Sequence, residues 1–279
     1  MTRLLLAFLA AMTMAAASPA FAQTPSESQR IELPASAGRT IPVTLWPARD
    51  ERGVIVFSHG FNGSPDSYGR IIQLWVEQGF TVVAPLHVDS LRHPEHAAYD
   101  NQAAFGARIE DLAIVRGFAK ATRPGLPMVA AGHSFGSLMA LIQAGAVTAA
   151  GPLGDADIRG VIAFSSPGDI PGLVTPQTYQ GLTAPLLMIT GDEDLVPGFV
   201  TDWTAHRSPF DRSPEGDRTL VVFEGGGHSL AADADEADFA LIAELNTAFL
   251  DAYAFGDAEA LARLEAIEAG AAGATIERR

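Results

Sequence analysis

Short, unbroken apolar runs alternate along this sequence with stretches of helical periodicity, and this alternation constrains the fold more than any other feature. An apolar run without polar interruption is typical of a strand buried on both faces of a sheet. The segment between the first two runs has helical spacing and stops at Gly79. The pattern therefore predicts an α/β protein with a mostly parallel sheet and helices on both faces. The runs are Gly53–Ser58, Phe80–Pro85, Met128–Gly132, Gly160–Ser165, Pro185–Thr190 and Thr219–Glu224.

The remaining segments are assigned by the same signals. Arg39–Ala48 alternates apolar and polar residues, which predicts an antiparallel strand near a sheet edge. Apolar residues recur every three or four positions in Asn101–Thr122, which predicts a long helix. Further helices are expected near Phe199–Ala205, Asp235–Tyr253 and Asp257–Glu268.

The first 22 residues have the layout of a secretory signal peptide. Arg3 precedes the apolar stretch Leu4–Ala17, and an Ala-x-Ala pattern ends at Ala22. A membrane anchor would need about 20 apolar residues and would not need this cleavage pattern. We expect cleavage after Ala22, a periplasmic or secreted protein, and a single α/β domain over residues 23–279.

Composition excludes several classes of site and partner. The chain has no cysteine, so it has no disulfide, no thiolate nucleophile and no thiolate metal site. Its net charge of −15 argues against nucleic acid or anionic membrane surfaces as partners. No later apolar run is long enough to span a bilayer, so stable membrane insertion is not expected. No phosphate-binding glycine motif follows a predicted strand, and we expect no cofactor.

Gly132-His133-Ser134-Phe135-Gly136 places a serine where a predicted strand turns sharply into a helix. The flanking glycines leave room for a strained backbone that lifts the hydroxyl above the sheet at the helix N-terminus. A capping serine in a turn of small residues has the same letters. The strand–helix context favours Ser134 as a nucleophile.

A serine hydroxyl becomes a good nucleophile when a histidine accepts its proton. His228 lies in a glycine-rich loop after the last predicted strand, where the order serine, acid, histidine requires it. The acid should lie between them at a strand end. Asp194 is the first choice because of its spacing from Gly191, and Asp192 is the second.

Attack on a carbonyl also requires donors for the negative charge that develops on its oxygen. The backbone N–H groups of Phe135 and Phe61 are the expected donors of this oxyanion hole. Three side chains are expected to form hydrophobic walls of the substrate pocket: Tyr179, Phe199 and Trp203.

The other histidines are assigned no part in the chemistry. His133 is expected to be a packed neighbour of the serine, His59 to shape the turn after its strand, and His206 to be exposed in a polar loop. A metal site is not expected in the irregular segment after Pro85, because it lacks ligands at helical i, i+4 spacing. Its metal-ligand residue types are His87, Asp89, His93, Glu95 and His96.

Arg108 and Asp111 lie three residues apart on the long predicted helix. This spacing predicts an ion pair on the helix surface.

Taken together, these segments resemble the α/β-hydrolase superfamily, and within it the dienelactone-hydrolase-like and platelet-activating-factor-acetylhydrolase-like branch. The resemblance rests on VIVFSHGFNGSPDSYGRII, VAAGHSFGSLMALIQAGA, APLLMITGDEDLVP and HRSPFDRSPEGDRTLVVFEGGGHSL in that order, and covers about Gly53–Asp257. Two departures stand out. Dienelactone hydrolases use a cysteine nucleophile, which this chain lacks, and Ser137 replaces the family's usual second glycine.

The resemblance implies an α/β-hydrolase fold with an eight-stranded sheet and short cap loops. It also implies a Ser134–Asp194–His228 triad that cleaves carboxylic esters through an acyl-enzyme. An acyltransferase, lactonase or peptidase with the same triad, or a non-catalytic binding protein on this scaffold, are the alternatives. The expected partner is a small-molecule or polymeric ester substrate; which ester it is and the oligomeric state stay open.

Overall fold

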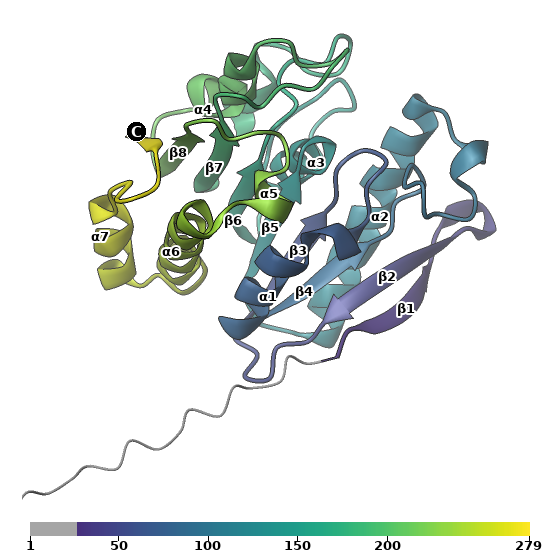
Figure 1. Ribbon diagram of the computed structural model, residues 1–279. Helices are drawn as coiled ribbons and strands as arrows, with labels where there is room; N and C mark the ends of the chain where they lie inside the picture. Colours follow the sequence, from purple (N-terminus) through teal and green to yellow (C-terminus); the bar gives the residue numbers. More distant parts are fainter. Residues whose placement is uncertain (1–26) are drawn as a thin grey trace, which may run out of the picture.

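Nine strands form one mixed sheet in the computed structural model, which describes residues 27–279 (Figure 1). The expected signal peptide, residues 1–22, lies outside the described residues. The strand order is β1-β2-β4-β3-β5-β6-β7-β8-β9. The strands are β1 (Gln29–Pro34), β2 (Thr40–Trp46), β3 (Gly53–Ser58), β4 (Phe80–Pro85), β5 (Met128–His133), β6 (Ile158–Phe164), β7 (Leu186–Gly191), β8 (Arg218–Phe223) and β9 (Ala274–Arg278).

The strands from β3 to β8 are parallel to one another, whereas β1, β2 and β9 run antiparallel to their neighbours. Every residue of β3, β4, β5, β7 and β8 is buried, which explains their unbroken apolar runs. Successive residues of β3 enter opposite cores: Val54 and Val56 pack on one face, and Ile55 and Phe57 on the other.

Helices cover both faces of the sheet, as the sequence predicts. α2 (Asn101–Thr122) and α3 (Phe135–Gln143) pack into one core, while α1 (Gly69–Glu77) and α6 (Glu236–Phe255) pack into the other (Figure 1). Shorter helices complete the chain: α4 (Ser208–Arg212), α5 (Leu230–Asp233) and α7 (Ala258–Ala266). No helix among residues 27–279 is both long enough and apolar enough to cross a bilayer.

Aspartate caps set the start of the long helices. The Asp100 carboxylate accepts a hydrogen bond from the Ala103 amide at 2.8 Å and begins α2. Asp235 caps α6 in the same way, and α6 ends at Phe255, before Gly256, whose φ of 69° is left-handed. Asp257 then caps α7 directly, so two helices are separated by a two-residue turn.

The sheet has nine strands rather than the expected eight, because both of its edges extend further than the sequence patterns show. β1 and β9 are half-exposed and carry charged residues, so neither has the apolar run that marks a buried strand. The prediction of a helix near Phe199–Ala205 is also wrong. A short 3-10 helix, Trp203–Arg207, leads there into α4.

The parallel strands bring four loops to one edge of the sheet. The carboxyl ends of β3, β5, β7 and β8 lead into the segments that carry Phe61, Ser134, Asp194 and His228. The carboxyl edge of an open α/β sheet is where ligands bind.

Gly191, at the end of β7, offers a test of how tightly the loops at this edge pack. A Cβ on Gly191 would lie 2.0 Å from the Gly226 carbonyl oxygen, so we expect Gly191→Ala to cost about 2 kcal/mol of unfolding free energy. For a chain of this size the melting temperature should fall by about 5 °C. Gly227→Ala is the matched control, because a Cβ on Gly227 would meet nothing within 4 Å. Equal melting temperatures for the two variants would contradict this packing.

Candidate active site

Ser134 lies at a sharp turn between β5 and α3. Its φ of 53° and ψ of −125° are strained for a residue with a side chain. A Cβ on Gly132 would lie 2.2 Å from the Gly136 carbonyl oxygen, and one on Gly136 would lie 2.0 Å from the Ser58 carbonyl oxygen. Only glycine fits at either position. The strain is maintained because β3, β5 and α3 touch through their backbones.

A hydrogen-bonded chain connects Ser134 to a buried carboxylate. His228 Nε2 lies 3.0 Å from Ser134 Oγ, and His228 Nδ1 lies 2.7 Å from Asp194 Oδ1. A carboxylate can only accept, so Nδ1 carries the proton and Nε2 is free to accept from the serine hydroxyl. The His228 side chain is 26% exposed, whereas Asp194 is fully buried. The geometry thus joins a hydroxyl, a base and an orienting acid in one line.

Asp194 occupies the position facing His228, and Asp192 does not. The Asp192 carboxylate is exposed and accepts a hydrogen bond from the Gly225 amide at 2.6 Å. Asp194 Oδ2 accepts from the Thr190 hydroxyl at 2.8 Å. Burial alone would raise the pKa of Asp194, but hydrogen bonds from His206 and His228 outweigh burial and hold it well below its usual range.

The loop after β3 lies directly against the serine. A Cβ on Gly60 would lie 3.5 Å from Ser134 Cβ, and the ring centroids of Phe61 and Phe135 are 6.3 Å apart. Among residues 27–279, neither the Phe61 nor the Phe135 amide donates to another protein group. Two free amides beside a serine hydroxyl are the donors that an oxyanion needs.

Comparison with known proteins agrees with this architecture. The family described as "Serine aminopeptidase, S33" matches residues 49–171. A monoglyceride lipase from Saccharomyces cerevisiae, solved as a soluble variant with a substrate analogue, superposes with a TM-score of 0.63 at 15% identity over 84% of this chain and 96% of that one. No curated protein matches the sequence.

Two other structures have the same fold but different activities in their names. A thermostable carboxyl esterase from Bacillus coagulans gives a TM-score of 0.63 at 17% identity, over 82% of this chain and 99% of that one. A puromycin-hydrolysing peptidase from Mycobacterium tuberculosis gives a TM-score of 0.61 at 12% identity, over 82% of this chain and 39% of that one. The protein has the α/β-hydrolase fold. At these identities the likeness establishes the fold and does not choose among reactions.

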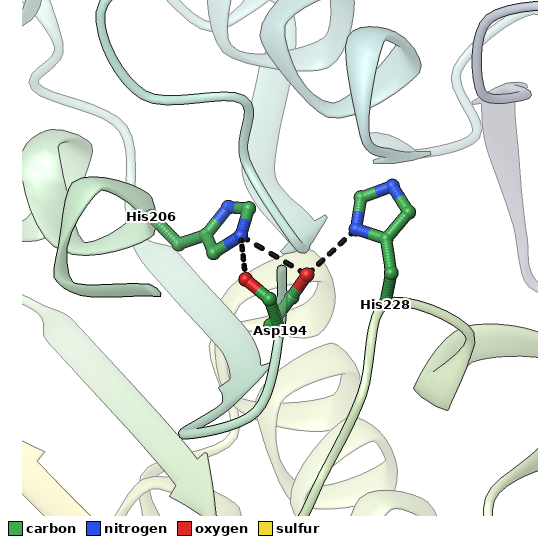
Figure 2. Close-up of side chains that lie close together, drawn as sticks. All are labelled: Asp194, His206 and His228. Atoms are coloured by element: carbon green, nitrogen blue, oxygen red, sulfur yellow. Dashed lines mark hydrogen bonds and ion pairs between the residues drawn. The ribbon is translucent and has the colours of Figure 1, made fainter. Parts of the chain in front are cut away.

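The sequence prediction for His206 is wrong. His206 is not exposed but fully buried, and its Nε2 lies 3.0 Å from Asp194 Oδ1. Figure 2 shows His206 and His228 on opposite sides of Asp194. The 3-10 helix Trp203–Arg207 carries the ring inward, and no local sequence signal marks that contact.

His133 is a packed neighbour of the serine, as expected, and it links two loops of the site. The Gly60 amide donates to the Tyr68 hydroxyl at 3.1 Å, and this hydroxyl lies 2.8 Å from His133 Nδ1. His133 Nε2 donates to the His228 carbonyl at 2.7 Å. Burial, together with the neighbouring His228, lowers the pKa of His133 to about 4, so the ring is neutral near pH 7.

Arg108 also contradicts its sequence prediction, because it is fully buried and does not form a surface pair with Asp111. Its guanidinium donates to both carboxylate oxygens of Asp89, at 2.8 and 2.7 Å. It also donates to the carbonyls of His59 and Gly60, at 2.7 and 3.2 Å. Arg108 therefore holds the backbone of the loop that carries the Phe61 amide. A helix pattern cannot show partners that are 19 to 50 positions away in the sequence.

A second Ser–His–Asp chain lies beneath this loop. Ser58 Oγ is 3.0 Å from His87 Nε2, and His87 Nδ1 is 2.8 Å from Asp111 Oδ2. The three side chains have at most 1% exposure, so no substrate can reach Ser58. Burial and the charge of Arg108 hold the pKa of His87 well below its usual value, which keeps it neutral. We interpret this chain as structural.

The expected substrate walls have three different environments. The prediction that Tyr179 forms a wall of the substrate pocket is wrong, because its side chain is fully buried beneath the surface. Trp203 is half-buried and packs against the core. Phe199 is 79% exposed and lines a pocket of about 520 Å³ together with Pro167 and Asp202. Ser134 is not among the residues that line this pocket.

One group of metal-ligand residue types converges within residues 27–279. The ligand atoms of Asp194, His206 and His228 lie within 4.8 Å of one another. Each imidazole nitrogen in this group already donates a proton to Asp194. A cation would have to displace both protons, and we therefore assign the group to hydrogen bonding. The segment from His87 to His96 does not form such a group.

The Arg108–Asp89 pair predicts a specific pH dependence of stability. Burial raises the pKa of Asp89, but the Arg108 hydrogen bonds and charge outweigh it and lower the value to about 2. A depressed pKa stabilises the fold above the unfolded value of about 4, and this contribution is lost as the pH falls towards 2.

Asp89→Asn should therefore lower the free energy of unfolding by about 3 kcal/mol at pH 7, because Arg108 loses its counter-ion. This deficit should narrow by about 2 kcal/mol between pH 4 and pH 2 in denaturant titrations. Asp66→Asn, at a surface ion pair with Arg30 and Arg92, is the control and should change stability by less than about 0.5 kcal/mol. A deficit that is constant from pH 7 to pH 2 would refute the assignment.

Proposed function

We propose that this protein is an exported serine hydrolase that cleaves carboxylic esters through an acyl-enzyme on Ser134. The observation that carries the proposal is the hydrogen-bonded line from Ser134 Oγ through His228 to Asp194, next to the free Phe61 and Phe135 amides. The signal-peptide pattern of residues 1–22 supports export to the periplasm or beyond. The segments that resemble the dienelactone-hydrolase-like and platelet-activating-factor-acetylhydrolase-like branch support that assignment.

The geometry supports a two-step reaction. Ser134 Oγ attacks the ester carbonyl carbon while its proton passes to His228 Nε2, and the carbonyl oxygen accepts from the Phe61 and Phe135 amides. The C–O bond to the alcohol then breaks, and His228 gives its proton to the departing alkoxide. In the second step water attacks the acyl carbon with His228 as base, and Ser134 leaves with the returned proton.

Exposed apolar side chains around the carboxyl edge favour an ester with an apolar group. Four of the six large exposed hydrophobic residues within 27–279 lie on its loops, and the other two, Val147 and Phe255, do not. The Leu91 amide donates to the Asn62 carbonyl at 3.2 Å, so Leu91 borders the loop of Phe61. The four are Phe61, Leu91, Leu195 and Phe199.

Covalent labelling with a fluorophosphonate tests the nucleophile. We expect rapid labelling of the wild type and a loss of at least about a thousandfold in the labelling rate of Ser134→Ala, because the activated hydroxyl is gone. Ser58→Ala is the matched control, since Ser58 belongs to the buried Ser–His–Asp chain and should leave labelling at Ser134 intact. Labelling that survives in Ser134→Ala would overturn the proposed role of this serine.

The acyl series of p-nitrophenyl esters tests the substrate class. We expect kcat/KM to rise about tenfold from acetate to hexanoate, because each buried methylene contributes about 0.8 kcal/mol and burial at an open edge is partial. Leu195→Ser should flatten this rise, and Val147→Ser should not, because Val147 lies away from the edge. Faster cleavage of peptidyl anilides than of all the esters would favour a peptidase instead.

A further inference from the structure

His206 is in direct contact with Asp194, and the proposed mechanism does not use it. It enters from the side opposite His228, on the 3-10 helix Trp203–Arg207, and is fully buried (Figure 2). Its Nε2 lies 2.8 Å from the Asp194 carbonyl oxygen and 3.0 Å from Asp194 Oδ1. The same carboxylate oxygen accepts from His228 Nδ1.

Both ring nitrogens of His206 face oxygen atoms that can only accept. Nδ1 is hydrogen-bonded to the Ser166 carbonyl, and Nε2 to the two oxygens of Asp194. A neutral imidazole has one donor nitrogen, so it would leave one of these contacts as a pair of facing acceptors. Only the doubly protonated ring satisfies both. The contacts therefore describe His206 as a buried imidazolium paired with Asp194.

The charged and titratable groups around His206 are consistent with this state. Burial lowers the pKa of His206, but the hydrogen bond and charge of Asp194 and the Ser166 carbonyl outweigh it, and the net shift is upward. His228 stacks on the ring with centroids 6.0 Å apart, and neutral His133 lies beyond it. The adjacent Arg207 is directed to Asp211 and Glu277.

Both carboxylate oxygens of Asp194 are consequently held by contacts with neighbouring side chains. Oδ2 accepts from Thr190, and Oδ1 accepts from His206 and His228. We propose that His206 is a positioning residue of the Ser134 site, which as an imidazolium fixes the Asp194 carboxylate against His228 and places a positive charge beside the His228 ring. This proposal rests on the proposed function, since it assigns His206 to the same reaction.

The electrostatic part of the proposal has a clear sign. A positive charge on His206 disfavours a second positive charge close to it. Two unit charges about 6 Å apart interact strongly enough to move a titration by about 0.5 to 2 pH units, depending on the effective dielectric. Removing the His206 charge should move the acid limb of the kcat/KM profile to higher pH.

Two substitutions separate positioning from charge. His206→Gln keeps a neutral donor that can reach Asp194, while His206→Phe keeps a ring of similar shape with no donor. Thr204→Ala, an exposed position on the same 3-10 helix, is the matched control. Each variant is assayed with p-nitrophenyl butyrate from pH 5 to 9, next to its melting temperature.

For His206→Phe we expect kcat to fall about 10- to 100-fold with KM changed less than about twofold, as for other residues that orient a reacting group. His206→Gln should retain more of kcat, and both variants should show the acid limb shifted upward. Thr204→Ala should match the wild type. If His206→Phe does not fold, His206→Gln carries the pH test alone.

A 15N NMR spectrum of the histidine-labelled full chain gives an independent measurement. At pH 8 we expect one imidazolium signal pair, which is absent in His206→Gln. A neutral His206 at pH 8, or an acid limb that does not move in either variant, would overturn the proposal. Activity that survives in Ser134→Ala would instead overturn the proposed function, so the two failures are distinguishable.

Discussion

The first turn of α3 lies so close to the carboxyl ends of β5 and β3 that neither Gly132 nor Gly136 could carry a side chain. This backbone contact determines where Ser134 stands, because the turn into α3 has no other path, and it also brings the loop of Phe61 to the serine. The strained φ of Ser134 is a consequence of the contact. The remaining parts of the site are arranged around a nucleophile whose position is set by backbone rather than by side-chain packing.

Buried charges then fix the loops that the backbone contact leaves free. The Arg108–Asp89 pair holds the loop after β3, and His206 holds the Asp194 carboxylate after β7. Burying such charges is costly unless each is paired and fully hydrogen-bonded, and both groups meet that condition. Their contribution is to orientation: each pair leaves its loop a single arrangement in which its polar groups are satisfied.

The sequence predicts well what depends on neighbours along the chain. The parallel strands, the long helices and the turn at Ser134 all follow from local periodicity and glycine placement, and the order of Asp194 and His228 follows from strand ends. Its errors concern contacts between distant segments. Arg108 looks like a surface residue of its helix, His206 like an exposed residue of a polar loop, and Tyr179 like a pocket wall, because their burial is decided by segments far away in the sequence. The edge strands β1 and β9 lack apolar runs, and their pairing depends on neighbours that are already in place.

The hydrogen bonds from Gly60 through Tyr68 and His133 to the His228 carbonyl have a consequence for how such a site would work. They tie the donor loop and the base loop into one unit before any ester arrives. Binding energy from the substrate is then not needed to assemble the site, and can act on the transition state instead. In the proposed esterase, adaptability to different esters then has to come from the exposed apolar side chains at the carboxyl edge, namely Phe61, Leu91, Leu195 and Phe199.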